Sequence, residues 1–132
     1  MILKDDERQT LVKLYLGKSD EAMEDALLNC SQARWNAAAN RLYYSLFHAL
    51  TALFVCDGIP VRSHSGMKAK FGKEYVLTGK ASEEEGKLLS QMETMRERAD
   101  YDATFTASES VIKERTESVR NMIQHIKELI FK

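Results

Sequence analysis

The sequence RWNAAANRLYYSLFHALTALFVC, which spans Arg34–Cys56, has the pattern of one long helix with two different faces. At ~100° per residue, large apolar side chains fall on one broad face, as in a helix that packs on a core. These are Trp35, Ala39, Leu42, Tyr43, Leu46, Leu50, Leu53 and Phe54. The other side carries four hydrogen-bonding residues, Arg41, Tyr44, Ser45 and His48, with small residues beside them. No face is typical of exposure to water, so we expect the polar side to meet a ligand, a second subunit, or both.

The composition limits the classes of protein to which the chain can belong. Its 132 residues carry 19 Lys and Arg against 20 Asp and Glu, a net charge of −1. Such a balance gives no overall field that attracts nucleic acid or an anionic membrane, so any RNA contact has to be local. A chain of this length can bury enough apolar surface to fold without disulfides or metals. We therefore expect one helical domain over residues 1–132.

Cysteine usage and the N-terminal segment predict a cytoplasmic protein. Cys30 and Cys56 lie in apolar surroundings at a spacing that matches no metal signature, which favours free thiols in a reducing compartment. The N-terminal MILKDDERQT lacks the apolar run of a signal peptide, and no segment approaches the ~18 apolar residues of a membrane span. We expect no association with a membrane.

The placement of proline and glycine predicts an all-α fold. The chain has 1 Pro, and most of its 6 Gly fall between periodic segments. The Arg34–Cys56 helix should end near Gly58, because glycine takes the left-handed turn and Pro60 forbids continuation. Ser31 is the expected cap at its start, and a loop over Ile59–His64 should follow it.

The other helices complete an up-and-down four-helix bundle with one extra short helix. The first helix should run from about Asp6 to Leu28, and the short one from about Ser65 to Val76. Apolar residues on one side of the first helix should pack inward: Leu11, Leu14, Tyr15, Ala22, Ala26 and Leu27. Capping boxes predict the starts of the last two helices, at Ser82 with Glu85 and at Thr106 with Glu109. Short connections favour antiparallel neighbours, and the last helix should pack against the first and second.

Two groups of polar residues are candidates for binding an anion. Arg41, Tyr44 and His48 place a guanidinium, a phenol and an imidazole on one helix face, where they can bind a phosphate or orient a nucleophile. The same stripe also suits a polar seam within a helical dimer. His64 lies beside the start of a helix whose free amides can bind an anion, although a loop histidine without a ligand fits the sequence equally well.

A third group is the pair Arg96 and Asp100, which lie four residues apart on one helix edge. As an exposed ion pair it would contribute at most ~0.5 kcal/mol, and nothing functional would follow from it. The spacing of His48 and His64 matches no zinc pattern. We therefore expect neither a metal nor another cofactor.

Three motifs carry these groups: Asn40-Arg41-x-Tyr43-Tyr44-x-x-Phe47-His48, His64-x-Gly66 and Arg96-x-x-x-Asp100-Tyr101. Together they resemble the HEPN superfamily of helical domains, and in particular its small stand-alone bacterial and archaeal branch. The resemblance covers nearly the whole chain. It implies a helical bundle that forms a homodimer and is encoded beside a minimal nucleotidyltransferase as a toxin and antitoxin pair. The expected binding residues for a nucleotide or RNA ligand are Asn40, Arg41, Tyr44, His48, His64, Arg96, Asp100 and Tyr101.

The sequence departs from one feature of that superfamily. Many of its members are metal-independent ribonucleases whose active site is an Arg followed, after four to six residues, by a His. The corresponding positions after Arg96 hold Tyr101, Asp102 and Ala103, and those after Arg98 hold Ala103, Thr104 and Phe105. Neither arginine has its histidine. Either His48 or His64 replaces it from another element, or the domain does not cleave RNA, and we favour the second.

Three hypotheses remain. The leading one is a homodimeric module that binds a partner nucleotidyltransferase and a nucleotide or RNA, without ribonuclease activity. The rival is a divergent metal-independent endoribonuclease toxin, with Arg96 and either His48 or His64 as the catalytic residues. In the third, the polar groups serve only to hold a dimer together.

Overall fold

The computed structural model describes residues 3–60 and 63–132, and this part of the chain is all-α with no strand. Each helix begins and ends within a few residues of the predicted positions, so the predicted fold class is confirmed. None of the described helices is long and apolar enough to cross a bilayer. The elements are α1 (Asp5–Ser31), α2 (Trp35–Asp57), α3 (His64–Phe71), the π-helical turn η1 (Gly72–Val76), α4 (Glu83–Tyr101) and α5 (Glu109–Ile130).

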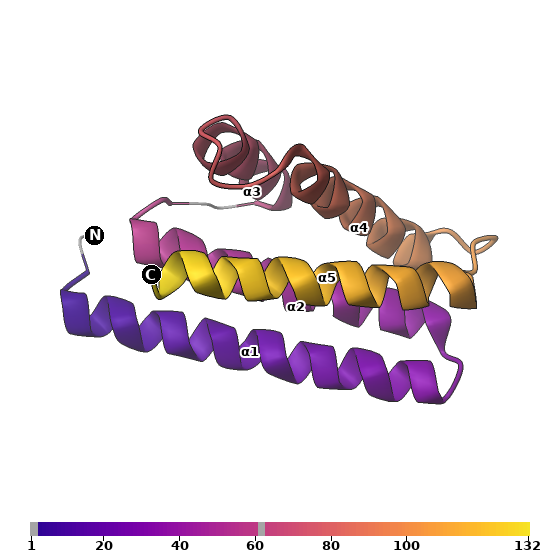
Figure 1. Ribbon diagram of the computed structural model, residues 1–132. Coiled ribbons are helices and arrows are strands. Elements are labelled where there is room, and N and C mark those ends of the chain that lie inside the picture. The colour runs from indigo at the N-terminus through magenta and orange to yellow at the C-terminus, as the bar shows by residue number, and fades with distance from the viewer. Residues whose placement is uncertain (1–2, 61–62) are drawn as a thin grey trace.

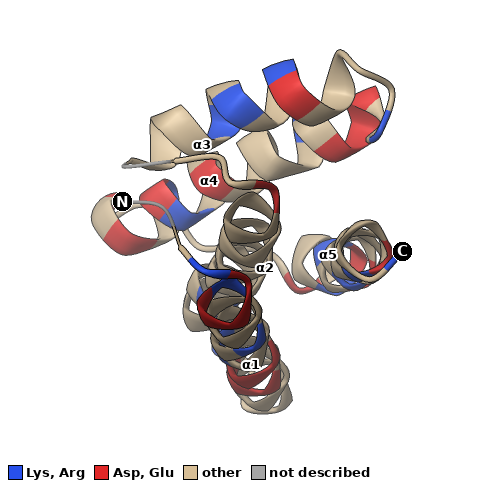
Figure 2. Cartoon of the chain, turned by 90° about the vertical axis from the view of Figure 1, so that its left-hand side faces the viewer, with Lys and Arg blue, Asp and Glu red and all other residues tan. Residues whose placement is uncertain are grey.

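The four long helices alternate in direction, and α2 lies at their centre. Helices α1 and α4 run one way, while α2 and α5 run the other (Figure 1). A view along the bundle shows α2, almost free of charged residues, between α1 on one side and α3 with α4 on the other (Figure 2). Helix α5 packs mainly on α2. Its contacts with α1 include the ion pair between Lys127 of α5 and Asp20 of α1, at 3.3 Å, and the side chain of Ile130. The predicted packing of the last helix on the first is therefore only marginal.

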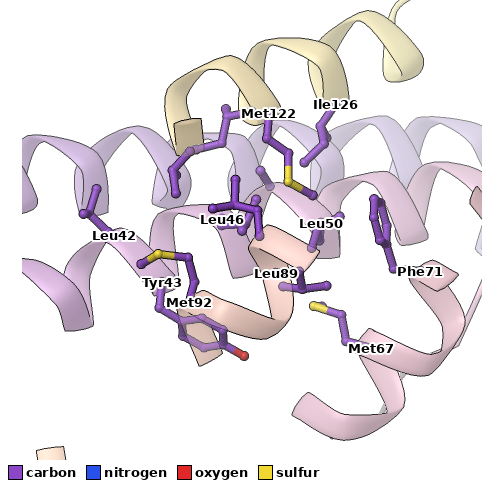
Figure 3. Close-up of a cluster of buried hydrophobic side chains, with 14 of the residues drawn as sticks. Leu42, Tyr43, Leu46, Leu50, Met67, Phe71, Leu89, Met92, Met122 and Ile126 are labelled. Atoms are coloured by element: carbon purple, nitrogen blue, oxygen red, sulfur yellow. The ribbon is translucent and has the colours of Figure 1, made fainter. Parts of the chain in front are cut away.

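The central position of α2 explains why its sequence has no water-facing side. Only Ala37 and Asp57 are exposed along α2, because α1, α4 and α5 cover the rest within one chain. Its apolar face forms the core together with side chains from α3, α4 and α5. Figure 3 labels ten residues of this core, from all four helices: Leu42, Tyr43, Leu46, Leu50, Met67, Phe71, Leu89, Met92, Met122 and Ile126. Ser45, placed on the polar side by its sequence, is fully buried between α1 and α2.

The buried side of α1 agrees with the predicted one at Ala22 and Ala26 and differs from it at Leu14 and Leu27. Its buried residues are Val12, Leu16, Ser19, Ala22 and Ala26, whereas Leu14 and Leu27 are 59% and 40% exposed. Small side chains let the two helix axes approach closely, and the Ser19 hydroxyl donates to the Ser45 carbonyl at 2.7 Å. The buried side of α1 therefore adds Val12, Leu16 and Ser19 to the two predicted alanines and leaves Leu14 and Leu27 outside.

Ser31 does not cap α2. Helix α1 continues through Ser31, whose hydroxyl donates back into its own helix, and α2 begins after Arg34 without a side-chain cap. The chain turns at Ala33, a non-glycine residue at φ 57°. Its amide donates to the Cys30 carbonyl at 3.0 Å, and that of Arg34 donates to the Asn29 carbonyl at 2.9 Å. This pair of bonds closes the corner as a Schellman motif.

Thr106 does not cap α5 either, since the cap is Ser108, whose hydroxyl accepts from a backbone amide in the first turn. Asn36 of α2 holds the preceding segment outside the helix. Its amide group donates to the Phe105 carbonyl at 3.1 Å and its carbonyl accepts from the Ala107 amide at 2.8 Å. These two bonds fix the backbone on both sides of Thr106 against α2, and α5 begins only after Ser108.

The capping box of α4 is confirmed. The Ser82 hydroxyl accepts from the Glu85 amide at 3.1 Å, and the Glu85 carboxylate accepts from the Ser82 amide at 2.9 Å. The second oxygen of the same carboxylate lies 2.8 Å from Nδ1 of His125. Glu85 therefore joins the start of α4 to α5.

Candidate functional site

Most of the predicted site residues form one group, which we call the Arg–aromatic cluster. Three elements supply it: α2 gives the aromatic residues, α3 gives a histidine at its first residue, and α4 gives an arginine and an aspartate near its end. The cluster is defined by Asn40, Arg41, Tyr43, Tyr44, Phe47, His48, His64, Arg96 and Asp100.

Arg96 is buried, which rules out the interpretation that it belongs to a surface ion pair. Only 8% of the residue is exposed, and its guanidinium carbon lies 5.3 Å from the ring centre of Tyr43 and 5.9 Å from that of Tyr44. The carboxylates of Asp100 and Glu97 are 3.7 and 4.0 Å away, too far for strong hydrogen bonds, and the buried Nε has no hydrogen-bond partner. Burying a cation costs free energy unless it is paired and hydrogen-bonded, so an anionic ligand bonded to the Arg96 guanidinium would reduce that cost.

Arg41 approaches the same aromatic ring from within α2. Its guanidinium carbon lies 5.3 Å from the ring centre of Tyr44, and its Nε donates to the side-chain oxygen of Asn40 at 3.0 Å. The Asn40 amide in turn donates to Asp100 at 3.0 Å. Asp100 therefore neighbours both Arg96 and the group that positions Arg41. Two guanidiniums therefore lie near one tyrosine ring, with the Asp100 carboxylate beside Arg96.

His64 enters the cluster through an aromatic contact and a hydrogen bond. Its ring centre is 4.6 Å from that of Phe47, and its Nδ1 is 2.6 Å from the hydroxyl of Tyr43. Burial, reinforced by the nearby Glu93 carboxylate, raises the pKa of Tyr43 well above its ordinary value. The phenol therefore keeps its proton, and donation of that proton to Nδ1 places the proton of a neutral imidazole on Nε2.

His48 is held in its neutral form. Burial lowers the pKa of His48, and the positive charges of Lys18 and Arg41 lower it further. Its ring packs near Tyr44 and is stacked against Tyr15 of α1, with ring centres 6.1 and 6.5 Å away, and its buried Nδ1 has no hydrogen-bond partner. A neutral imidazole at pH 7 can accept a proton or a hydrogen bond from a ligand.

A cavity of about 450 Å³ adjoins the cluster where α1, α2 and α3 meet. Its volume is within the range of small-molecule sites, ~300–1,000 Å³. The two histidines and several aromatic or apolar side chains line it, among them Tyr15, Phe47, His48, His64 and Met67. The arginines of the cluster thus have beside them a mostly apolar cavity, which shares Phe47, His48 and His64 with the cluster.

Two site residues were missed by the sequence interpretation and one predicted residue lies apart. Tyr43 and Phe47 were assigned to the apolar face or left without a role, yet they hold His64. Their spacing of four residues, with aromatic side chains on both, was the available signal. Tyr101 is 80% exposed and makes none of the contacts that define the cluster.

A second missed pair lies on the inner side of α4. Glu93 is 9% exposed and its carboxylate is 3.8 Å from the Lys68 amine of α3. Among the residues that the structure describes, no three metal-ligating side chains come together.

The fold and the site define an all-α helical bundle with a buried arginine between α4 and α2. Comparison with known proteins gives the family. The HEPN domain model matches residues 12–129, and the chain belongs to the HEPN family. It is 31% identical over 124 residues to a UPF0332 protein of Thermotoga maritima, a match that covers 94% of each chain.

Two proteins of Methanocaldococcus jannaschii also match. One, named "Putative toxin MJ0142", is 30% identical over 98 residues, which cover 74% of this chain and 66% of the other. The second, named "Putative toxin MJ0605", is 26% identical over 128 residues, which cover 95% of this chain and 92% of the other.

Proposed function

We propose that this chain is the toxin-like HEPN module of a toxin–antitoxin pair and binds the phosphate of a nucleotide or RNA at the Arg–aromatic cluster. The observation that carries the proposal is the placement of Arg41 and Arg96 on one tyrosine ring, with Arg96 buried, its Nε without a hydrogen-bond partner and its nearest carboxylate 3.7 Å away. Guanidinium groups bind phosphate oxygens in pairs of hydrogen bonds, and aromatic side chains bind bases by stacking. The adjoining cavity supplies such aromatic surfaces.

A binding assay tests this proposal. Fluorescence anisotropy with a labelled single-stranded RNA and, separately, with a nucleotide should show saturable binding that weakens as salt is added. Arg41→Gln and Arg96→Gln should each weaken binding by about 10-fold or more, because each removes charge-assisted hydrogen bonds. Arg120→Gln is the matched control, since Arg120 is an exposed arginine of α5 outside the cluster. Equal affinity in all three variants would contradict the assignment.

We propose further that the module acts as a homodimer with a minimal nucleotidyltransferase as its antitoxin partner. Support comes from the family and from the relatives that carry the name toxin. Light scattering should give twice the 15.1 kDa mass of the chain. A tagged copy should retain the co-expressed nucleotidyltransferase through washing, and a monomer that retains no such partner would contradict this part of the proposal.

Metal-independent RNA cleavage is the second candidate function, and the neutral His48 in the cavity favours it. In such a reaction His48 would take the proton of a ribose 2′-hydroxyl, whose oxygen attacks the phosphorus while the 5′ oxygen leaves. Arg96 would stabilise the added negative charge. The test is RNA cleavage in the presence of a chelator by the wild type and by Arg96→Ala, His48→Ala and His64→Ala. Cleavage that these variants lose would make the chain a ribonuclease, whereas folded protein that binds RNA without cleaving it supports the binding role.

A further inference from the structure

A second cavity lies on the side of α4 that faces away from the Arg–aromatic cluster. It is an open pocket with a volume of about 460 Å³, lined by the second half of α4, the residues that connect α4 to α5, and the first turns of α5. Arg96 and Arg98 are two positions apart, so at ~100° per residue their side chains leave α4 in nearly opposite directions. Arg96 contacts Tyr43 of α2, whereas Arg98 lines this second cavity.

Two guanidiniums face this cavity, and none of the described residues that line it is acidic. Arg98 lies over the ring of Phe105, 4.4 Å from its centre, and Asp102 is 3.8 Å from its Nε. Arg115 is mostly buried, with 23% of its side chain exposed, and its buried Nε has no hydrogen-bond partner. Its ion-pair neighbour, Glu114, is 3.6 Å away and 72% exposed. Both ion pairs are longer than a hydrogen bond, so neither cation is fully neutralised.

The rest of the lining suits a ligand with an apolar body. Phe105, Met95 and Val111 supply apolar surface, while Thr94 and Ser108 supply hydroxyl groups. The backbone of Phe105 is held by Asn36 of α2, whose side-chain amide donates to the Phe105 carbonyl at 3.1 Å. Pockets of this size, mostly apolar with a few convergent polar groups, are typical of small-molecule sites.

We propose that this second cavity binds a small organic oxyanion, with the anionic head between Arg98 and Arg115 and the apolar body against Phe105. A guanidinium pairs with a carboxylate or a phosphate through two parallel hydrogen bonds, so either head satisfies the chemistry. The site is separate from the proposed function of the Arg–aromatic cluster and does not depend on it.

Titrations followed by backbone-amide NMR test the proposal with four probes: phenyl phosphate, benzoate, inorganic phosphate and phenol. Phenyl phosphate or benzoate should shift the amides of Ala107 and Val111 saturably, with a Kd of about 1–10 mM for a ligand of this size. Whichever of the two binds tighter identifies the head group. Phenol, which lacks the charge, and inorganic phosphate, which lacks the ring, should each bind at least about tenfold more weakly.

Substitutions of the two arginines test whether the organic anions bind in this cavity. Arg115→Gln and Arg98→Gln should each raise the Kd by about 10-fold or more, while Arg120→Gln on the same helix as Arg115 should leave it unchanged. Arg98 is 56% exposed, so its replacement keeps the test valid if Arg115→Gln fails to fold. Arg41→Gln, in the other cluster, should not change the Kd. The proposal is overturned if neither organic anion gives a saturable shift at concentrations up to about 100 mM, roughly tenfold above the weakest expected Kd, or if Arg98→Gln binds as well as Arg120→Gln.

Discussion

The hydroxyl of Tyr43 lies 2.6 Å from Nδ1 of His64 and ties the first turn of α3 to the middle of α2. The two rings are also packed together, with centres 5.6 Å apart. A buried phenol that keeps its proton can donate it to Nδ1, and we predict this arrangement, in which a neutral imidazole of His64 carries its proton on Nε2. The orientation of His64 in the cavity is therefore set by a residue that has no need to touch the ligand.

Replacing Tyr43 with Phe should remove that control while the core stays filled. We expect the free energy of unfolding to fall by about 1 kcal/mol, the usual net value of one hydrogen bond. The ring-nitrogen NMR signals of neutral His64 should change from one tautomer to a mixture. Tyr101→Phe is the control, because Tyr101 is 80% exposed. An unchanged tautomer in Tyr43→Phe would show that another group orients the ring.

Asn36 holds the chain between α4 and α5 through two hydrogen bonds to the backbone of Phe105 and Ala107. Asn36→Ala leaves both backbone groups without their partner, so urea unfolding should show a loss of about 2 kcal/mol. Asn121→Ala, an exposed position on α5, should change the stability by less than about 0.5 kcal/mol. Equal effects of the two changes would mean that water replaces Asn36 at no cost.

Ala33 and Gly58 make an informative pair, since both take a left-handed backbone conformation at φ 57° and 71°. This conformation costs an L-residue about 1 kcal/mol, which glycine avoids. Ala33→Gly should therefore raise the free energy of unfolding by up to about 1 kcal/mol. Gly58→Ala should lower it, because a Cβ there would also lie 3.2 Å from a guanidinium nitrogen of Arg8. Thermal unfolding of both variants tests the opposite signs, and two changes of the same sign would be inconsistent with this account.

The periodicity of apolar residues was sufficient to predict the helices, because burial of one face is the main term that stabilises them. It failed where a tertiary contact competes with a local signal. Thr106 has a favourable capping sequence, yet Asn36, 70 positions earlier in the chain, holds its neighbours in another conformation. The side of α1 that packs was predicted only in part: Ala22 and Ala26 are buried as expected, whereas the burial of Val12, Leu16 and Ser19 was not predicted.

The cluster could be predicted from motifs on three elements, but its internal geometry could not. The helical period assigns Tyr43 to the apolar face but does not predict which group its hydroxyl contacts. Likewise, the four-residue spacing of Arg96 and Asp100 predicts their contact, whereas the burial of Arg96 under two tyrosine rings depends on how α4 crosses α2. Tertiary contacts, rather than local spacing, decide these features.

His48 should make the stability of the protein depend on pH. Because burial and the charges of Lys18 and Arg41 hold the pKa of His48 below its ordinary value of 6.5, the unfolded chain binds a proton at this residue first as the pH falls. The stabilising effect of the neutral ring is therefore complete above about pH 6.5 and declines as the pH drops from there toward the lower pKa of the folded state. His48→Gln, which cannot titrate, should lose less stability than the wild type between pH 7.5 and pH 5.5 by urea unfolding. Direct NMR titration of the imidazole gives the pKa itself, and a value at or above the ordinary one would show that a negative group outweighs the burial of this ring.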